Sequence, residues 1–338
     1  MRLTRRGMLA GAATIAGLPL ATREGVAPAE AAATLDGAIK GPPVKDRPLK
    51  QISRRVFVVQ APDGFPTPEN QGLMSNIVFI VGEKGVIVVD SGASLQIAEM
   101  TIRQLRAHTD KPVVGIVNTH YHGDHWLGNH GFVDAYGEDL PIYAHAGARE
   151  KIAGATGKSW HDSMIGWTHD ATLGTRIVAP NRDVDHGFAL SLGDATLKFH
   201  KYGVAHTPDD ISVEVVEDNV MCVGDIMMDR RIANMDDGSY KGTFETIDAL
   251  ARNSDTKIWV PGHGEAGAAV LTWQRELFKG IYEPCVEAVK RGVPLAGALD
   301  LVMKDARVSS RAAETAGFDR NIGKYVSLAY LEAEQDNF

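Results

Sequence analysis

The sequence contains the stretch Asn118-Thr119-His120-Tyr121-His122-Gly123-Asp124-His125. Three imidazoles and one carboxylate therefore fall within six consecutive positions. On a tight loop after a strand, such side chains can present nitrogen and oxygen ligands to two neighbouring cations, and zinc suits that ligand set best. The β-branched, apolar residues 113–117 indicate a strand before the stretch, and residues 126–129 can open a helix after it. We therefore predict a metal site in a strand-loop-helix context.

Three further candidate ligands, His206, Asp225 and His263, follow in separate loop-like segments. Loops at strand ends are where a rigid scaffold commonly presents functional side chains. Each residue also has an ordinary interpretation, since Gly-His-Gly occurs in plain turns and Asp225 fits a turn residue after a strand. The remaining histidines lack such a context, and we interpret them as surface or satisfied core residues: His108, His130, His145, His161, His169, His186 and His200.

The order of these blocks, His-x-His-x-Asp-His, a later His, a later Asp and Pro-Gly-His, resembles the metallo-β-lactamase superfamily of hydrolases over roughly residues 57–264. The resemblance implies a four-layer αββα sandwich, with two mixed sheets packed face to face and a dinuclear metal site at one edge. It also implies that the first metal is bound by His120, His122 and His206. The second metal would be bound by Asp124, His125 and His263, and Asp225 would bridge both.

Asp90 matches the first sequence block of the family, in Gly85-Val86-Ile87-Val88-Val89-Asp90-Ser91-Gly92. The resemblance implies that Asp90 supports the histidine loop from behind the ligands, with helix capping as the alternative. It implies two zinc ions per chain, with iron or manganese as alternatives. A hydroxide bridging the two cations would then attack the ester, thioester, lactone or amide carbonyl of a small molecule. Asp124 would be the catalytic residue that orients this nucleophile or receives its proton.

Other functions stay open beside this metal-dependent hydrolase. Class B β-lactamases usually have Cys or Ser at the position of Asp225, which argues against β-lactamase activity, whereas an exported location argues for it. A relative with a single iron could act like a persulfide dioxygenase, and a non-catalytic metal-binding accessory protein would turn over little. The overall plan is similar to periplasmic metallohydrolases of sulfur-oxidation and quinoprotein systems, so we favour a general hydrolase.

The N-terminal residues 1–33 resemble a twin-arginine export signal. Arg5 and Arg6 precede the weakly hydrophobic residues 11–21 and the alanine-rich residues 27–33. The apolar stretch is too short to span a bilayer, so we expect no stable membrane insertion after cleavage. The mature protein is expected in the periplasm or outside the cell. A basic amphipathic arm is the alternative interpretation.

Composition limits the remaining choices. A chain of 338 residues with 44% hydrophobic content can bury one large core, or one core and a small appendage. The net charge of −8 and the lack of a long basic run argue against nucleic acid as a partner, so we expect a small-molecule substrate. Cys222 and Cys285 are predicted to be separate buried thiols. The sequence leaves the oligomeric state open.

We divide the chain into an export signal (1–33), a leader (34–50), a metal-hydrolase domain (51–265) and a C-terminal helical extension (266–338), and expect the fold to begin near Ile52. The apolar patterns predict these strands: Val56–Gln60, Ile77–Val81, Val86–Val89, Val113–Asn118, Ala195–Lys201, Ile211–Val216, Val220–Val223 and Lys257–Val260. They predict these helices: Leu95–His108, Ala146–Ala153, Phe244–Ala251, Ala268–Val289, Leu295–Val308 and Phe318–Glu334. The alternation favours a layered α/β sandwich.

Two insertions are candidates for the mouth of a substrate pocket. Residues 63–68 form a turn-rich loop that carries Phe65, and residues 159–175 carry Trp160 and Trp167 in a polar segment. Both have an ordinary interpretation, in which the aromatic side chains anchor their own segments. Arg230 or Arg231 is a further candidate that would bring a guanidinium near an anionic substrate, with a solvated pair as the alternative.

Overall fold

The computed structural model describes residues 34–35, 38–62, 64–232 and 235–337. The chain divides into two units, Met1–Ala31 and Ala32–Phe338, and the description below concerns the second. The predicted export signal lies outside the described residues. Among the helices of the described part, none is both long and apolar enough to cross a membrane.

A seven-stranded mixed sheet has the order β3-β4-β5-β6-β7-β8-β9. The strands from β3 to β6 pair in antiparallel fashion, and those from β6 to β9 pair in parallel. Their bounds are β3 (Lys50–Gln51), β4 (Val56–Val59), β5 (Ile77–Gly82), β6 (Gly85–Val89), β7 (Val113–Val117), β8 (Ile142–Ala144) and β9 (Arg182–Asp183). The central strands are buried on both faces, which explains their continuous apolar runs.

A five-stranded sheet has the order β10-β11-β12-β13-β14 and is antiparallel except for the last pair, β13 with β14. Its strands are β10 (Ala189–Ser191), β11 (Thr196–His200), β12 (Ser212–Val215), β13 (Val220–Gly224) and β14 (Ile258–Pro261). A small separate pair joins β1 (Thr34–Leu35) to β2 (Ala38–Ile39).

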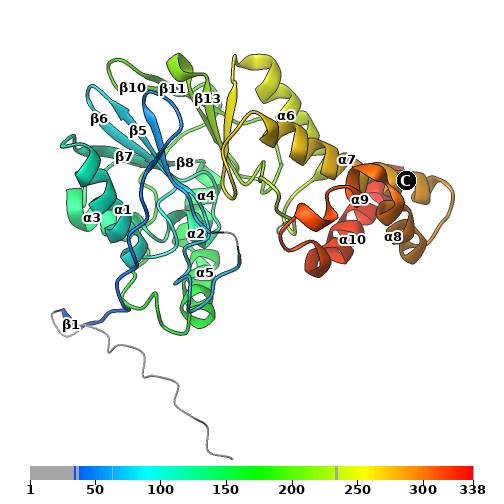
Figure 1. Cartoon of the computed structure of the whole chain (residues 1–338), viewed down its shortest axis with the longest axis horizontal. Coiled ribbons are helices and arrows are strands. Elements are labelled where there is room, and N and C mark those ends of the chain that lie inside the picture. The colour runs from blue at the N-terminus through cyan, green and yellow to red at the C-terminus, as the bar shows by residue number, and fades with distance from the viewer. Residues whose placement is uncertain (1–33, 36–37, 63, 233–234, 338) are drawn as a thin grey trace, which may run out of the picture. The chain divides into compact units, whose positions relative to one another are not determined.

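The two sheets pack face to face through one apolar core. Ile80 and Val89 of the first sheet share this core with Phe199 and Val213 of the second. The outer face of the first sheet packs on α1 (Leu95–His108) and α3 (Asn129–Tyr136), and that of the second packs on α6 (Tyr240–Asn253). Figure 1 shows α1 and α3 on one side of the strands and α6 on the other. This order of layers confirms the predicted αββα sandwich.

The C-terminal helices form their own apolar cluster. They are α7 (Ala269–Lys290), α8 (Leu295–Lys304), α9 (Ala306–Ser309) and α10 (Phe318–Asn337). Helix α7 continues through Pro284. The single helix expected over residues 295–308 is wrong, because Asp305 has an extended backbone and its carboxylate accepts a hydrogen bond from Arg307 N at 2.8 Å. Asp305 therefore ends α8 and caps α9.

The start of the fold also differs from the expectation at Ile52. Gly41 N donates a hydrogen bond to Leu173 O at 2.9 Å, and Val44 is buried in the core beside the first sheet. The polar composition of this segment concealed the packing. The segment expected as a polar excursion over residues 159–175 begins inside helix α5 (Ala155–Trp167), which follows α4 (Ala146–Ala153) directly.

Candidate metal centre

The histidine loop follows β7 and runs into the short helix α2 (Gly123–Trp126), which carries Asp124 and His125. Trp126 is fully buried, and its indole Nε1 donates to Tyr121 O at 2.9 Å, which fixes the middle of the loop. Asn118 donates through Nδ2 to His125 O at 3.3 Å and so ties the two ends of the loop together. The strand-loop-helix context predicted from the sequence is therefore confirmed.

The later candidates come from three other connections. His206 lies between β11 and β12, Asp225 follows β13 directly, and His263 follows β14. Because β13 and β14 are parallel neighbours, their carboxyl ends place Asp225 and His263 at the same edge of the sheet. Asn76 links this edge to the first sheet, since its Nδ2 donates to Pro261 O and Gly264 O, both at 2.9 Å.

The structure brings all seven predicted ligands together in two buried groups. Within each group the candidate ligand atoms all lie within 4.8 Å of one another. The groups are His120, His122, His206 and Asp225, and then Asp124, His125 and His263.

Asp225 also reaches the second group. Its Oδ2 lies 3.5 Å from His206 Nε2 and 3.3 Å from His263 Nε2, and its Oδ1 lies 3.4 Å from His125 Nε2. The carboxylate therefore stands between the two groups and touches both.

Several buried ligand atoms lack a hydrogen-bond partner in the described part of the chain. They are His120 Nε2, Asp124 Oδ2, His125 Nε2 and Asp225 Oδ1. Leaving such atoms unpaired in a protein interior costs free energy, so a cluster of them calls for an explanation. Cations bound between them would satisfy these atoms together, and the nitrogen and carboxylate donors fit zinc and related divalent ions.

The electrostatics of the first group favour neutral imidazoles. Burial, with the neighbouring imidazoles, holds the pKa of His120 well below its ordinary value. Burial beside His206 lowers the pKa of His122 to about 3. Burial opposes ionisation of Asp225, but His263 and His125 hold its pKa well below the usual range. Neutral imidazoles at His120 and His122 beside an ionised carboxylate are the protonation states that a metal requires of its ligands. Burial opposes protonation of His125, but Asp124 and Asp225 hold its pKa well above the ordinary value, so a bound metal would displace that proton.

Asp90 orients one imidazole in each group. Its Oδ2 lies 2.8 Å from His125 Nδ1 and accepts from Thr119 Oγ1 at 2.9 Å, and its Oδ1 accepts from Thr119 N at 2.8 Å. Thr119 Oγ1 in turn lies 3.0 Å from His120 Nδ1. Both imidazoles can therefore donate through Nδ1 and turn Nε2 toward the centre. Thr119 was missed at the sequence level, although it immediately precedes His120.

A cavity of about 390 Å³ opens onto the two groups. Its wall is mainly apolar, and both predicted insertions contribute to it, the first through Phe65 and the second through Trp160 and Trp167. The Trp160 ring lies 4.9 Å from the His122 ring, and Trp167 is 46% exposed at the rim. The full lining is Phe65, Pro66, Met74, His122, Asp124, Trp160, Trp167, His206, Asp225, Arg231 and His263.

The two candidate arginines separate in the structure. Arg231 is buried and lines the cavity. Arg230 is absent from the lining; its guanidinium pairs with Asp229 at 3.0 Å and lies 5.0 Å from the Trp273 ring centroid. Of the two candidates, Arg231 is therefore the one that lies at the cavity.

Comparison with known proteins agrees with this geometry. The family model described as the metallo-beta-lactamase superfamily matches residues 70–263, which include every candidate ligand. The chain belongs to the metallo-beta-lactamase superfamily. This superfamily includes many metal-dependent hydrolases.

Solved structures of this superfamily share the fold at low sequence identity. A metallo-beta-lactamase from Pontibacter korlensis is 18% identical and covers 68% of this chain and 98% of its own, with a TM-score of 0.55. The DIM-1 metallo-beta-lactamase is 17% identical and covers 70% of this chain and 99% of its own, with a TM-score of 0.53. The stereoselective inverting sec-alkylsulfatase Pisa1 from Pseudomonas sp. is 17% identical, with a TM-score of 0.64, and covers 84% of this chain and 50% of its own. The superfamily fold, with added C-terminal helices, is thereby confirmed.

Proposed function

We propose that this member of the superfamily is a dinuclear metal-dependent hydrolase that uses zinc. One observation carries the proposal: two groups of buried ligand atoms share the carboxylate of Asp225, and both groups contain ligand atoms that lack a hydrogen-bond partner among the described residues. A single-metal site would leave one of the groups unsatisfied. Iron or manganese would be held by the same donors and remains an outcome of the test below.

In this proposal His120, His122 and His206 would hold the first metal, Asp124, His125 and His263 would hold the second, and Asp225 would be shared by both. When bound, such ions supply Lewis-acid activation of a water and of the scissile group. The wall of the cavity is mainly apolar, and surroundings of low polarity strengthen electrostatic interactions. Asp124 Oδ2 lies 3.2 Å from His125 Nε2 and 3.4 Å from His263 Nε2, at the floor of the cavity. From there its carboxylate would hold the attacking water in position or take a proton from it.

The substrate we propose is a small molecule with an ester, thioester, lactone or amide bond. The screen should add a β-lactam and an alkyl sulfate, since the structures that share this fold include β-lactamases and an alkylsulfatase. Turnover of the β-lactam alone would redirect the assignment to β-lactamase activity. Full metal loading without turnover of any compound would favour the accessory role.

Elemental analysis of the protein purified without added metal tests the proposal first. We expect about two zinc ions per chain in the parent and a clear loss in Asp225→Ala, because that change removes the ligand shared by both groups. Asp162→Ala is the matched control, since this carboxylate is exposed and pairs only with nearby side chains. A single iron in the parent, together with persulfide-dependent oxygen consumption, would overturn the dizinc hydrolase in favour of the dioxygenase.

We also propose that the protein is exported by the twin-arginine route, which rests on the sequence of residues 1–33 alone. Replacing both Arg5 and Arg6 with Lys should leave the protein uncleaved in the cytoplasm of a host that exports the parent. Export of the double variant at the parent's level would overturn this proposal.

A further inference from the structure

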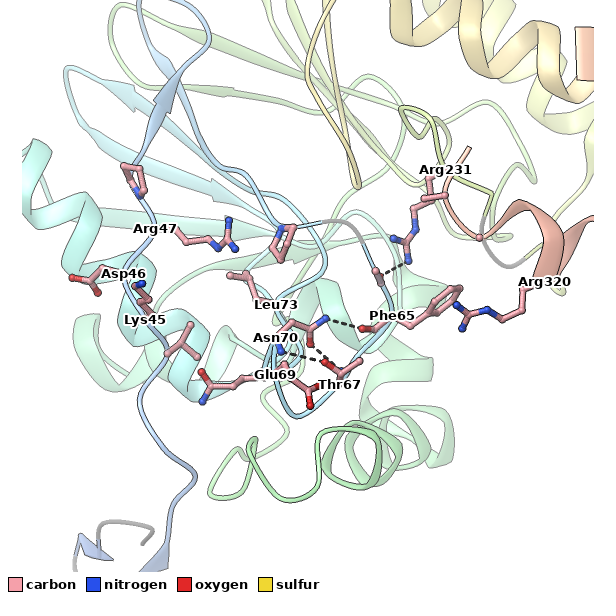
Figure 2. A pocket seen from close by; sticks show the side chains of 17 residues that line it. Lys45, Asp46, Arg47, Phe65, Thr67, Glu69, Asn70, Leu73, Arg231 and Arg320 are labelled. Carbon is pink, nitrogen blue, oxygen red and sulfur yellow. Dashed lines mark hydrogen bonds between the residues drawn. The ribbon is translucent and has the colours of Figure 1, made fainter. Parts of the chain in front are cut away.

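A second, larger cavity adjoins the candidate metal centre. Its volume is about 870 Å³, and it shares Phe65 and Arg231 with the metal cavity. Its wall comes from residues 44–48 of the leader, from residues 62 and 64–73, from Arg231, and from residues 316–320 around the start of α10. Figure 2 shows the leader residues on one side and Arg231 and Arg320 on the other.

Cationic side chains predominate in this second cavity. Lys45, Arg47, Arg231 and Arg320 line it, against the carboxylates of Asp46 and Glu69. Asp46 is already paired with an arginine outside the cavity, at 2.7 Å, and in Figure 2 its carboxylate points away from the other lining residues. Among the described residues, the lining of this cavity therefore carries a net positive charge, in a chain whose net charge is −8.

Three of these cations have no carboxylate partner in the described part of the chain. Lys45, Arg47 and Arg320 are exposed, and none of them forms an ion pair with a described residue. By contrast, most other arginines of the described part pair with acidic side chains, as Arg55 and Arg307 do. Unpaired cations that converge on one hollow produce a local positive potential that attracts anions.

Phe65 forms the partition between the two cavities. The guanidinium carbons of Arg231 and Arg320 lie 5.1 Å and 5.2 Å from the centroid of its ring. Arg231 also donates to Gly64 O at 2.8 Å and so holds the loop in place. The metal cavity and the cavity lined by Arg47 and Arg320 therefore meet at this ring.

We infer that the second cavity binds an anionic group at the far end of the substrate. This inference rests on the proposed hydrolase function and specifies its substrate class. The reacting bond and an apolar portion would occupy the metal cavity, against Phe65, Trp160 and Trp167. A carboxylate, sulfate or phosphate several atoms away would enter the second cavity, which Arg47 lines on one side and Arg320 on the other. Guanidinium groups suit such oxyanions because their planar donors match two oxygens at once.

A matched pair of chromogenic esters tests the inference on the metal-loaded full chain. One is the mono-4-nitrophenyl ester of adipic acid, and the other is the same compound with its free carboxylate methylated. We expect the parent to prefer the anionic ester. In the double variant Arg47→Gln/Arg320→Gln, KM for the anionic ester should rise about tenfold with kcat unchanged, since only uniform binding is lost. The values for the neutral ester should stay within about twofold.

Two controls make the comparison specific. Arg252→Gln removes an exposed arginine of α6 that lies outside both cavities, and it should change neither ester. Added sodium chloride should reduce the preference of the parent for the anionic ester, because contacts between exposed charges are screened. Thermal unfolding of each variant reports whether the fold is retained.

A binding measurement separates this inference from the proposed function. Adipate is titrated into the parent and the double variant while tryptophan fluorescence is followed, since Trp160 and Trp167 line the metal cavity. A carboxylate of adipate that binds at the metal centre would do so equally in the parent and in the double variant. Its contribution to affinity therefore cancels in the ratio of the two Kd values. A weaker Kd in the double variant, without turnover of either ester or of any other compound of the screen, would keep the anion subsite and overturn the hydrolase. Turnover of both esters with equal KM in parent and double variant would overturn the subsite and keep the hydrolase.

Discussion

Replacing Asp90 with asparagine should weaken both metal sites at once. The carboxylate of Asp90 faces three donors: Thr119 N, Thr119 Oγ1 and His125 Nδ1. Asparagine is a fair probe because Asp90 has a positive φ of 57°, which asparagine tolerates better than alanine does. The substitution therefore changes the hydrogen bonding with little change in backbone strain.

The cost follows from the geometry around the new amide. An amide has one accepting oxygen where the carboxylate has two. If its nitrogen faces Thr119 N, two donors oppose each other at 2.8 Å. If its nitrogen faces His125 instead, that imidazole must accept at Nδ1 and keep its proton on Nε2, the atom that faces Asp124 and Asp225. Loss of such an orienting contact lowers metal affinity about 10–100-fold, or ~1.4–2.7 kcal/mol.

Competition against a chromophoric zinc chelator measures the two stepwise affinities. We expect both to fall in Asp90→Asn, since the carboxylate orients His125 directly and His120 through Thr119. Thr119→Val provides the matched comparison, because it removes the hydroxyl beside His120 and leaves the contact with His125. It should weaken one site only, by about tenfold. Stepwise affinities of Asp90→Asn within about twofold of the parent's, with the metal-free fold intact, would refute this account of the site.

Two further predictions concern packing around the site and between the sheets. A Cβ on Gly262 would lie 2.0 Å from Asp225 Oδ1, so Gly262→Ala should lose metal. Gly267→Ala should keep its metal, because a Cβ there would meet nothing within 4 Å. Equal metal content of the two variants by elemental analysis would contradict this prediction. Asp218→Asn should lower the free energy of unfolding by about 3 kcal/mol, because Arg55 is buried and loses a paired charge while keeping a second carboxylate partner. Burial opposes ionisation of Asp218, but its hydrogen bonds and Arg55 lower its pKa. The difference in the free energy of unfolding between the parent and Asp218→Asn, measured in urea, should therefore be largest at neutral pH and shrink as the pH falls below about 4.

Long apolar strands and amphipathic helices were predictable from local pattern. Helices α1 and α4 have the expected bounds, and the central strands β5, β6 and β13 differ from expectation by a residue at most. Within the two main sheets, the missed strands, β3 and β8 to β10, have only two or three residues each, and β3, β9 and β10 are largely exposed. Such short pieces lack an apolar period, and they become strands only because a longer neighbour supplies the hydrogen bonds.

The site was predictable in its ligands and not in its surroundings. The order of the histidine and aspartate blocks along the chain indicated the family, so each of these residues could be predicted as a ligand from the sequence. The second cavity could not, since Arg47 and Arg320 are separated by most of the chain and nothing local marks either one. Their convergence depends on how the leader and α10 pack beside the loop that carries Phe65.

Chemistry and substrate choice therefore belong to different parts of this protein. The candidate ligands stand at strand ends of the sandwich, where the sheets fix their positions. The wall that would select a substrate comes from the leader, the loop of Phe65 and the start of α10, which lie outside the ligand blocks. The C-terminal helices join this wall directly, because Ile232 N donates to Ala316 O at 3.0 Å and Ala316 N donates to Arg230 O at 2.8 Å. Changes in these segments should alter which molecule is bound while leaving metal binding intact, and changes in the ligand blocks should abolish metal binding whatever the substrate.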